Sequence, residues 1–157
     1  MIRKLNNEAK AKINSDSPKE ALVYLTEAEK ILEYAASCGK NIDRNMIVCV
    51  LHNEACCYQK LWELEKCSNY LEALIFNISS HLKTSTPSPR EVEDYIKTSG
   101  SLSSHLRDSL YGKPINQRIQ LSKYHLQFCA INSQLRNHKG ALISGRRAIA
   151  IIKDIFQ

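Results

Sequence analysis

The side chains best suited to chemistry lie together between residues 52 and 57. His52 and Cys56 are four residues apart, which places them on one face of a helix, and Cys57 follows directly. An imidazole beside a thiol is the pair from which cysteine nucleophiles and zinc sites are built. A zinc site needs four converging ligands, and the remaining histidines form no second pair at ligand spacing: His81, His105, His125 and His138. We therefore interpret both cysteines as small hydrophobic residues of a helix interface, and predict no metal and no other cofactor.

Other sequence signs of catalysis are missing. The sequence contains no phosphate-binding loop, no nucleophile elbow and no carboxylate pair with the arrangement of an active site. The acids Glu27, Glu29 and Glu33 are predicted to lie on a solvated helix face. We predict that the protein is not an enzyme. A small cysteine-dependent enzyme remains the rival hypothesis, which the alkylation rate of the native thiols would test.

The two cysteines belong to a segment that reads as a helical hairpin, at about residues 43–84. Apolar residues recur every three or four positions in each half, and only a short break at residues 61–63 separates the halves. Such helices can bury their apolar stripes only against each other and against neighbours. The stripes are Val48, Leu51, Ala55, Tyr58 and Trp62 in the first half and Leu64, Cys67, Leu71, Leu74, Ile78 and Leu82 in the second.

A first hairpin is predicted at about residues 2–38. Its first helix spans residues 2–14, and the break before Pro18 restarts the chain with Ser17 as the N-cap. The second helix ends near Gly39, which supplies a left-handed C-cap, and Asp43 caps the helix that follows.

A third hairpin is predicted at about residues 114–156, with a turn at Asn137 and His138. Gly145 costs about 1 kcal/mol inside a helix, which indicates close approach of a neighbouring helix. Residues 85–113 are rich in Ser, Thr, Pro and Gly, and we predict an irregular insertion there: a loop to about Pro87, then two short, poorly packed helices rather than disorder.

Composition bounds the class of protein. The 157 residues are 43% hydrophobic and only 7% aromatic, with five Gly and four Pro, which favours a single all-α domain over a strand-rich fold. The six cysteines follow no secreted disulfide framework and no signal peptide precedes them, so we expect reduced thiols and a cytoplasmic protein. No apolar run reaches the roughly 18 residues of a membrane span.

The three hairpins share a register. If Ile2, Val48 and Ser122 are aligned as first positions, small or apolar residues coincide at the eighth, twentieth, twenty-fourth and twenty-seventh positions. These are Ala9, Ala55 and Cys129; Ala21, Cys67 and Ala141; Leu25, Leu71 and Gly145; and Ala28, Leu74 and Ala148. This pattern resembles the tetratricopeptide repeat, although the repeats start 46 and 74 residues apart instead of 34, and the Trp–Leu–Gly pattern and the final Pro of the family are absent.

The resemblance implies a right-handed α-solenoid of stacked antiparallel hairpins, with a concave groove that holds a peptide or a partner helix. The groove residues it implies are Asn6, Lys10, His52, Asn53, Gln59, Lys123 and Gln127. One version of the family captures a carboxylate there. Asn53 and Lys123 match that version, whereas Asn6, Lys10 and Gln127 stand where it has Lys, Asn and Arg, and loss of the Arg removes a bidentate partner.

The formal net charge of +6 is concentrated at the C-terminal end, where residues 122–157 contain six Lys and Arg against one acid. We expect a basic patch of Arg136, Lys139, Arg146 and Arg147. It is either a solvated convex face or a docking surface for an acidic partner. Nucleic acid is disfavoured because no aromatic side chains interleave with the charges.

These patterns predict a non-enzymatic adaptor or scaffold subunit. The apolar end of the last helix, residues 149–156, needs a cover, so we expect assembly into a larger complex with other proteins, with a cytoskeletal or ciliary assembly as the suggested setting. The alternative is a helical-repeat domain that docks on RNA or another acidic polymer through the basic C-terminal hairpin.

Overall fold

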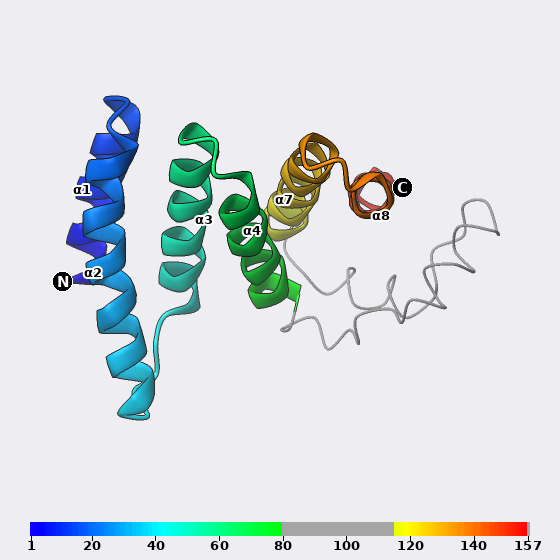
Figure 1. The fold of residues 1–157 in the computed structure, drawn as a ribbon. Coiled ribbons are helices and arrows are strands. Elements are labelled where there is room, and N and C mark those ends of the chain that lie inside the picture. Colours follow the sequence, from blue (N-terminus) through cyan, green and yellow to red (C-terminus); the bar gives the residue numbers. More distant parts are fainter. Residues whose placement is uncertain (80–114, 157) are drawn as a thin grey trace. The chain divides into compact units, whose positions relative to one another are not determined.

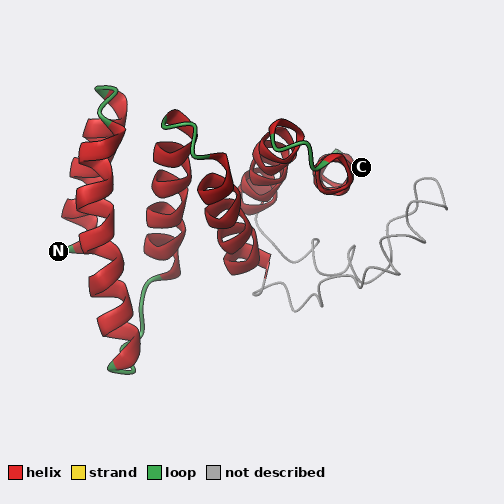
Figure 2. Ribbon diagram, in the orientation of Figure 1, coloured by secondary structure: helices red, strands yellow, loops and turns green. Residues whose placement is uncertain are grey.

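A computed structural model describes residues 1–79 and 115–156, and every regular element within those ranges is an α-helix (Figures 1 and 2). The predicted all-α class is confirmed. The insertion predicted at residues 85–113 lies outside the described residues. The helices are α1 (Ile2–Asn14), α2 (Pro18–Ser37), α3 (Arg44–Lys60), α4 (Leu64–Ser79), α7 (Ile115–Gln134) and α8 (His138–Ile155).

The chain divides into two compact units, Met1–Leu74 and Ile75–Gln157, and the division falls inside α4. In the first unit α1 packs against α2, and α3 contacts both of them. In the second unit α7 packs against α8. Each pair is joined by a turn of a few residues, so its helices are antiparallel.

Small side chains let the helices of the first unit approach closely. Ala9 of α1 and Ala21 and Ala28 of α2 are fully buried, and they occupy the shared positions of the sequence register. Larger apolar residues fill the space around them, and Ile2, Leu5 and Ile13 pack at the edge. The remaining members of this core are Leu25, Leu32, Val50 and Cys57.

The helix limits follow the predicted signals closely. Pro18 begins α2, and α2 ends at Ser37, two residues before Gly39, whose φ is 66°. The side chain of Asp43 accepts a hydrogen bond of 3.0 Å from the backbone N–H of Asn45, as expected of an N-cap. Ser17 occupies the N-cap position of α2, but its hydroxyl makes no cap bond; it donates to the carbonyl of Ser15 at 3.5 Å.

The three turns within the hairpins have the same backbone construction. Asp16, Trp62 and Arg136, which are 46 and 74 residues apart, all have a positive φ of about 60°. At each turn the N–H of the following residue donates to a carbonyl five residues earlier, with distances of 2.9, 3.0 and 2.8 Å. This is the Schellman ending of a helix, formed here without glycine. The turns are offset by the same 46 and 74 residues as the small residues of the register, and they support that register through backbone geometry rather than side-chain size.

The apolar stripe predicted for α3 is only partly correct. Ala55 is buried, but Val48 and Leu51 are half-buried and Trp62 is 76% exposed. The other fully buried side chains of α3 are those of Val50, Glu54 and Cys57, which also recur every three or four residues. α3 is covered from more than one side, so a single stripe does not describe its buried surface, and Trp62 lies in the turn rather than on the helix.

In the second unit the predicted close approach at Gly145 is confirmed. A Cβ atom placed on Gly145 would lie 3.3 Å from Sγ of Cys129, so α7 and α8 touch at this point. The turn between them is fixed by Asn137, whose side chain accepts from the N–H of Gly140 at 3.1 Å and donates to the side chain of Asn132 at 2.8 Å. Buried Leu121 and Ile151 form one apolar cluster of the unit with Ile75, Ile78 and Ile155.

None of the helices in the ranges 1–79 and 115–156 is both long and apolar enough to cross a membrane.

Candidate functional site

The predicted groove residues of the first unit meet at Asn6 and Asn53. The side-chain amide of Asn53 donates a hydrogen bond of 2.8 Å to the side-chain oxygen of Asn6, and both residues are half-buried. The bond joins the first helix of one hairpin to the first helix of the next, across 47 residues of sequence. It fixes the two helices at one point while leaving part of each amide open to solvent.

Lys10 lies one helical turn beyond Asn6 on α1, and its side chain is exposed. Gln59, near the end of α3, is exposed as well. At the same end, Lys60 forms an ion pair of 2.6 Å with Asp16 in the turn after α1, and this contact lowers the pKa of Asp16. The α1–α3 face, defined here as Asn6, Lys10, His52, Asn53 and Gln59, therefore combines one fixed amide pair with exposed polar side chains.

His52 and Cys56 are brought together, as their spacing predicts, with Nε2 and Sγ 3.7 Å apart. Both side chains are half-buried. Burial lowers the pKa of His52 and raises the pKa of Cys56, with a smaller opposite effect of Lys60 on the thiol. Both shifts favour the neutral groups. A cysteine nucleophile needs the reverse, a thiolate next to an imidazolium, so the arrangement is not that of an activated thiol.

The neighbouring thiols are less reactive still. Cys57 and Cys67 are fully buried, and burial raises the pKa of each to about 11. Within the described part of the chain, no group of three or more His, Cys, Asp or Glu residues is arranged to hold a metal ion.

A buried carboxyl group was missed by the sequence analysis. Glu54 is 1% exposed and its Oε2 atom has no hydrogen-bond partner among the described residues. Burial, together with the charge of Glu29 and a hydrogen bond to it, raises the pKa of Glu54 to about 9. The expectation that Glu29 is a solvated surface acid is corrected: it is half-buried and contacts Glu54, whereas Glu27 and Glu33 are exposed. The sequence does give one indication that Glu54 is buried. It lies four residues after Val50 and three before Cys57, which places it on the same side of α3 as these two residues.

Two tyrosines extend this cluster. The rings of Tyr58 and Tyr70 are stacked, with centroids 5.3 Å apart, and the ammonium of Lys66 lies 5.2 Å from the centre of the Tyr58 ring. Burial, and next the charges of Glu54 and Glu29, raise the pKa of Tyr70. The phenol of Tyr70 therefore stays protonated near neutral pH.

The remaining predicted groove residues, Lys123 and Gln127, lie on α7 in the second unit. Lys123 is exposed and Gln127 is half-buried.

The predicted basic patch divides into two kinds of residue. Arg136 and Lys139 are exposed, whereas Arg146 and Arg147 on α8 are half-buried. Burial lowers the pKa of Arg147. His125 of α7 is 4% exposed, and burial and the charge of Arg147 lower its pKa to about 4, so the ring is neutral. Arg147 thus belongs partly to the interior of the hairpin, and the patch is less continuous than the sequence suggests.

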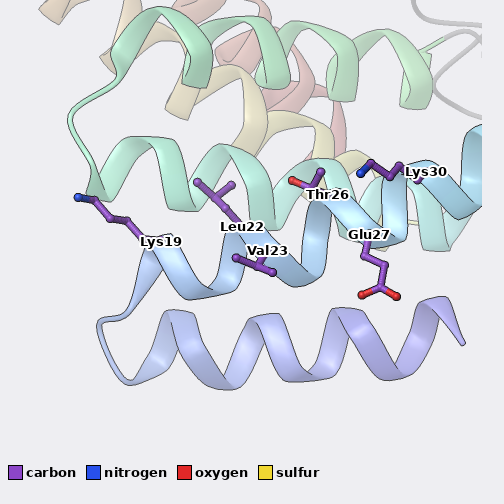
Figure 3. Close-up of a pocket in the computed structure, with 6 residues that line it drawn as sticks. All are labelled: Lys19, Leu22, Val23, Thr26, Glu27 and Lys30. Atoms are coloured by element: carbon purple, nitrogen blue, oxygen red, sulfur yellow. The ribbon is translucent and has the colours of Figure 1, made fainter.

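A shallow depression in the first unit is lined by six residues that all come from α2 (Figure 3): Lys19, Leu22, Val23, Thr26, Glu27 and Lys30. Figure 3 shows these side chains spread along one helix rather than converging on a point. An open surface of this kind has nothing to orient a small ligand.

Comparison with known proteins finds no family model that matches the chain, no similar curated protein and no similar solved structure.

Proposed function

We propose that the protein is a non-enzymatic adaptor that binds a peptide or a partner helix on the α1–α3 face, and that its hairpins stack as tetratricopeptide-like repeats. The observation that carries the proposal is the hydrogen bond between Asn53 and Asn6, which places the first helices of two successive hairpins side by side. Side chains on such paired helices form a polar face that can hydrogen-bond a peptide.

The repeat interpretation is supported by two further features. The shared small positions are buried in both hairpins of the first unit, with Ala9, Ala21, Ala55 and Cys67 all at 0% exposure. The three turns repeat one hydrogen-bond pattern. Hairpins that are built alike, with the first helices of the first two in contact, are suited to present a binding surface along α1 and α3.

The non-enzymatic interpretation is supported by the protonation states at the candidate nucleophile. The neutral thiol of Cys56 and the neutral ring of His52 favour packing over catalysis. The half-buried amides and the exposed Lys10 offer hydrogen bonds and one positive charge, which suit a polar or acidic segment of a partner protein.

The test compares two charge reversals in the tagged, full-length protein. Lys10→Glu changes the α1–α3 face, and Lys30→Glu makes the same charge change at an exposed position of α2. Proteins that co-purify from native cells are quantified for both variants and for the unchanged protein. We expect Lys10→Glu to reduce recovery of at least one partner by about tenfold and Lys30→Glu to leave it within about twofold.

Equal recovery with both variants, or equal loss with both, would overturn the assignment of binding to the α1–α3 face. Circular dichroism of each purified variant checks that the helices are retained, so that loss of binding cannot be confused with unfolding.

A further inference from the structure

The outward side of α8 carries apolar and basic residues in strict alternation. Leu142 is 50% exposed, Ile149 is 52% exposed and Phe156, directly after the helix, is 85% exposed. A basic residue lies between or beside each of them, and the spacing alternates between three and four residues. At about 100° per residue this spacing keeps the set on one side of the helix. We define the α8 stripe as Lys139, Leu142, Arg146, Ile149, Lys153 and Phe156.

The α8 stripe takes no part in the core of its own hairpin. The rest of the helix surface carries the buried residues of α8: Ala141, Ser144, Ala148, Ala150, Ile151 and Asp154. Ile151 packs with Leu121 of α7 and with Ile75 and Ile78, whereas the three apolar side chains of the stripe are each at least half exposed. Exposed apolar residues spaced regularly along about 21 Å of helix, from Leu142 to Phe156, are typical of a surface that binds another element.

The charge around the stripe has one sign. In the described part of the second unit, seven Lys and Arg residues stand against one acid, Asp154. That acid is buried, with 3% of its side chain exposed, and it pairs with Arg118 at 3.7 Å. Within the described ranges no ion pair involves Lys139, Arg146 or Lys153. An incoming acidic partner would therefore meet three cations that no acid in those ranges has already engaged.

We propose that the α8 stripe is a docking site for an acidic amphipathic helix of a partner protein. Apolar residues of that helix, spaced by three and four, lie against Leu142, Ile149 and Phe156, and its Asp and Glu residues pair with the basic residues between them. The site is on the second unit and is separate from the α1–α3 face, so each proposal can fail without the other.

The alternation favours a helix over a membrane or nucleic acid. A helix that lies on a membrane presents a broad apolar face, whereas here the exposed apolar residues Leu142, Ile149 and Phe156 form one narrow line, seven residues apart, beside a parallel line of cations. Single-stranded nucleic acid is bound by cations together with a series of stacking aromatic rings, and the α8 stripe offers one ring, Phe156, at its end. A second copy of α8 would place like charges opposite one another, which opposes pairing.

The probe is a synthetic helical peptide of about five turns, with Leu at alternating spacings of three and four and Glu between them, blocked at both ends. A second peptide of the same composition has its Leu residues redistributed so that no apolar side forms. Each is labelled and titrated with the full-length protein by fluorescence anisotropy. We expect binding of the patterned peptide at about 10 μM, weakened severalfold by added salt, and at least tenfold weaker binding of the redistributed peptide.

Two substitutions locate the site. Ile149→Ser and Arg146→Gln are each expected to weaken binding of the patterned peptide about tenfold. Their matched controls are Val23→Ser, at an apolar residue of α2 that is 67% exposed, and Arg3→Gln, at an exposed cation of α1, and these should change the affinity less than about twofold. Equal affinity for the two peptides, or equal effects of the stripe and control substitutions, overturns the proposal.

Three further measurements on the full-length protein test whether a membrane, RNA or a second copy of the chain binds the α8 stripe instead. The first is co-sedimentation with vesicles of phosphatidylserine and phosphatidylcholine. The second is titration with generic single-stranded RNA. The third is sedimentation of the protein alone over a range of concentrations. A stripe-dependent signal in any of these that is stronger than binding of the patterned peptide would overturn the proposal in favour of that occupant, and weaker signals in all three support it.

Discussion

Replacing Glu54 by Gln should change how the stability of the first unit depends on pH. The carboxyl group of Glu54 is 1% exposed, and burial and the neighbouring Glu29 raise its pKa from 4.5 to about 9. The other titratable groups around it are Tyr70 of α4 and Cys57 of α3, whose pKa values are also raised, so they remain neutral near pH 7. Glu54 is therefore the group of this cluster whose protonation differs between the folded and unfolded chain near neutral pH.

The sign follows from the direction of the shift. The folded chain holds a proton on Glu54 that the unfolded chain releases above pH 4.5, so the stabilising contribution is complete below that pH and is lost as the pH rises toward 9. Each pH unit in this window lowers the free energy of unfolding by about 1.4 kcal/mol, which amounts to about 3 kcal/mol at pH 7. Gln has the shape of the protonated acid and releases no proton, so Glu54→Gln should be more stable than the unchanged protein near pH 7 by a similar amount.

The measurement is denaturant unfolding between about pH 5 and pH 8, combined with hydrogen exchange of the α2 and α3 backbone amides, which reports the first unit specifically. Glu33→Gln is the matched control, since it removes an exposed carboxylate from α2. We expect a stability that falls with pH for the unchanged protein and for Glu33→Gln, and a flatter profile for Glu54→Gln. Parallel profiles for all three proteins would refute the reasoning.

Three further predictions follow from the packing. Cys57 should react with iodoacetamide at least about 100-fold more slowly than exposed Cys38 at neutral pH, because its thiol is buried and its pKa is about 11; peptide mapping after timed labelling checks this. Gly145→Val should lower the free energy of unfolding by about 2 kcal/mol by crowding Sγ of Cys129, and Cys129→Ala should recover part of that loss in a double-mutant cycle. Asp154→Ala should destabilise the protein by about 3 kcal/mol in denaturant unfolding, because it leaves a buried guanidinium on α7 without its carboxylate.

The limits of the helices could be predicted because they depend on local chemistry. Pro18, Gly39, Asp43 and Asn137 each act on the backbone within a few residues of themselves, so the sequence around them is sufficient to place a helix end. The contact at Gly145 was also predictable, because a glycine inside a helix has few explanations other than close packing.

The buried surface of α3 could not be predicted in the same way. A search for one apolar stripe selects the side with the most apolar residues and treats Glu54 as polar surface. Whether a carboxyl group can be buried depends on a partner from another helix, here Glu29 of α2, and the sequence does not show which residues of α2 and α3 meet. Trp62 was assigned to the interior because it continues the spacing of the stripe, but α3 ends at Lys60 and Trp62 itself has the left-handed conformation of the turn.

The candidate site likewise combines features that the sequence could predict with features that it could not. Sequence spacing was enough to bring His52 next to Cys56, since both lie on one helix and four residues make about one turn. The pairing of Asn6 with Asn53 depends on how α1 and α3 cross, which is a property of the packed unit. The protonation states of the thiols depend on burial, so the chemical character of the site could be decided only once its surroundings were known.

The turns indicate which part of this architecture tolerates change in sequence. Asp16, Trp62 and Arg136 are acidic, aromatic and basic, yet each occupies the same left-handed position. All three turns are closed by backbone hydrogen bonds between residues five apart. The side chains at this position are exposed, so they are free to serve other contacts, as Asp16 does with Lys60. What the hairpins share is backbone geometry and a few small buried residues. Hairpins specified in this way can diverge at almost every exposed position, including the α8 stripe, without loss of their fold.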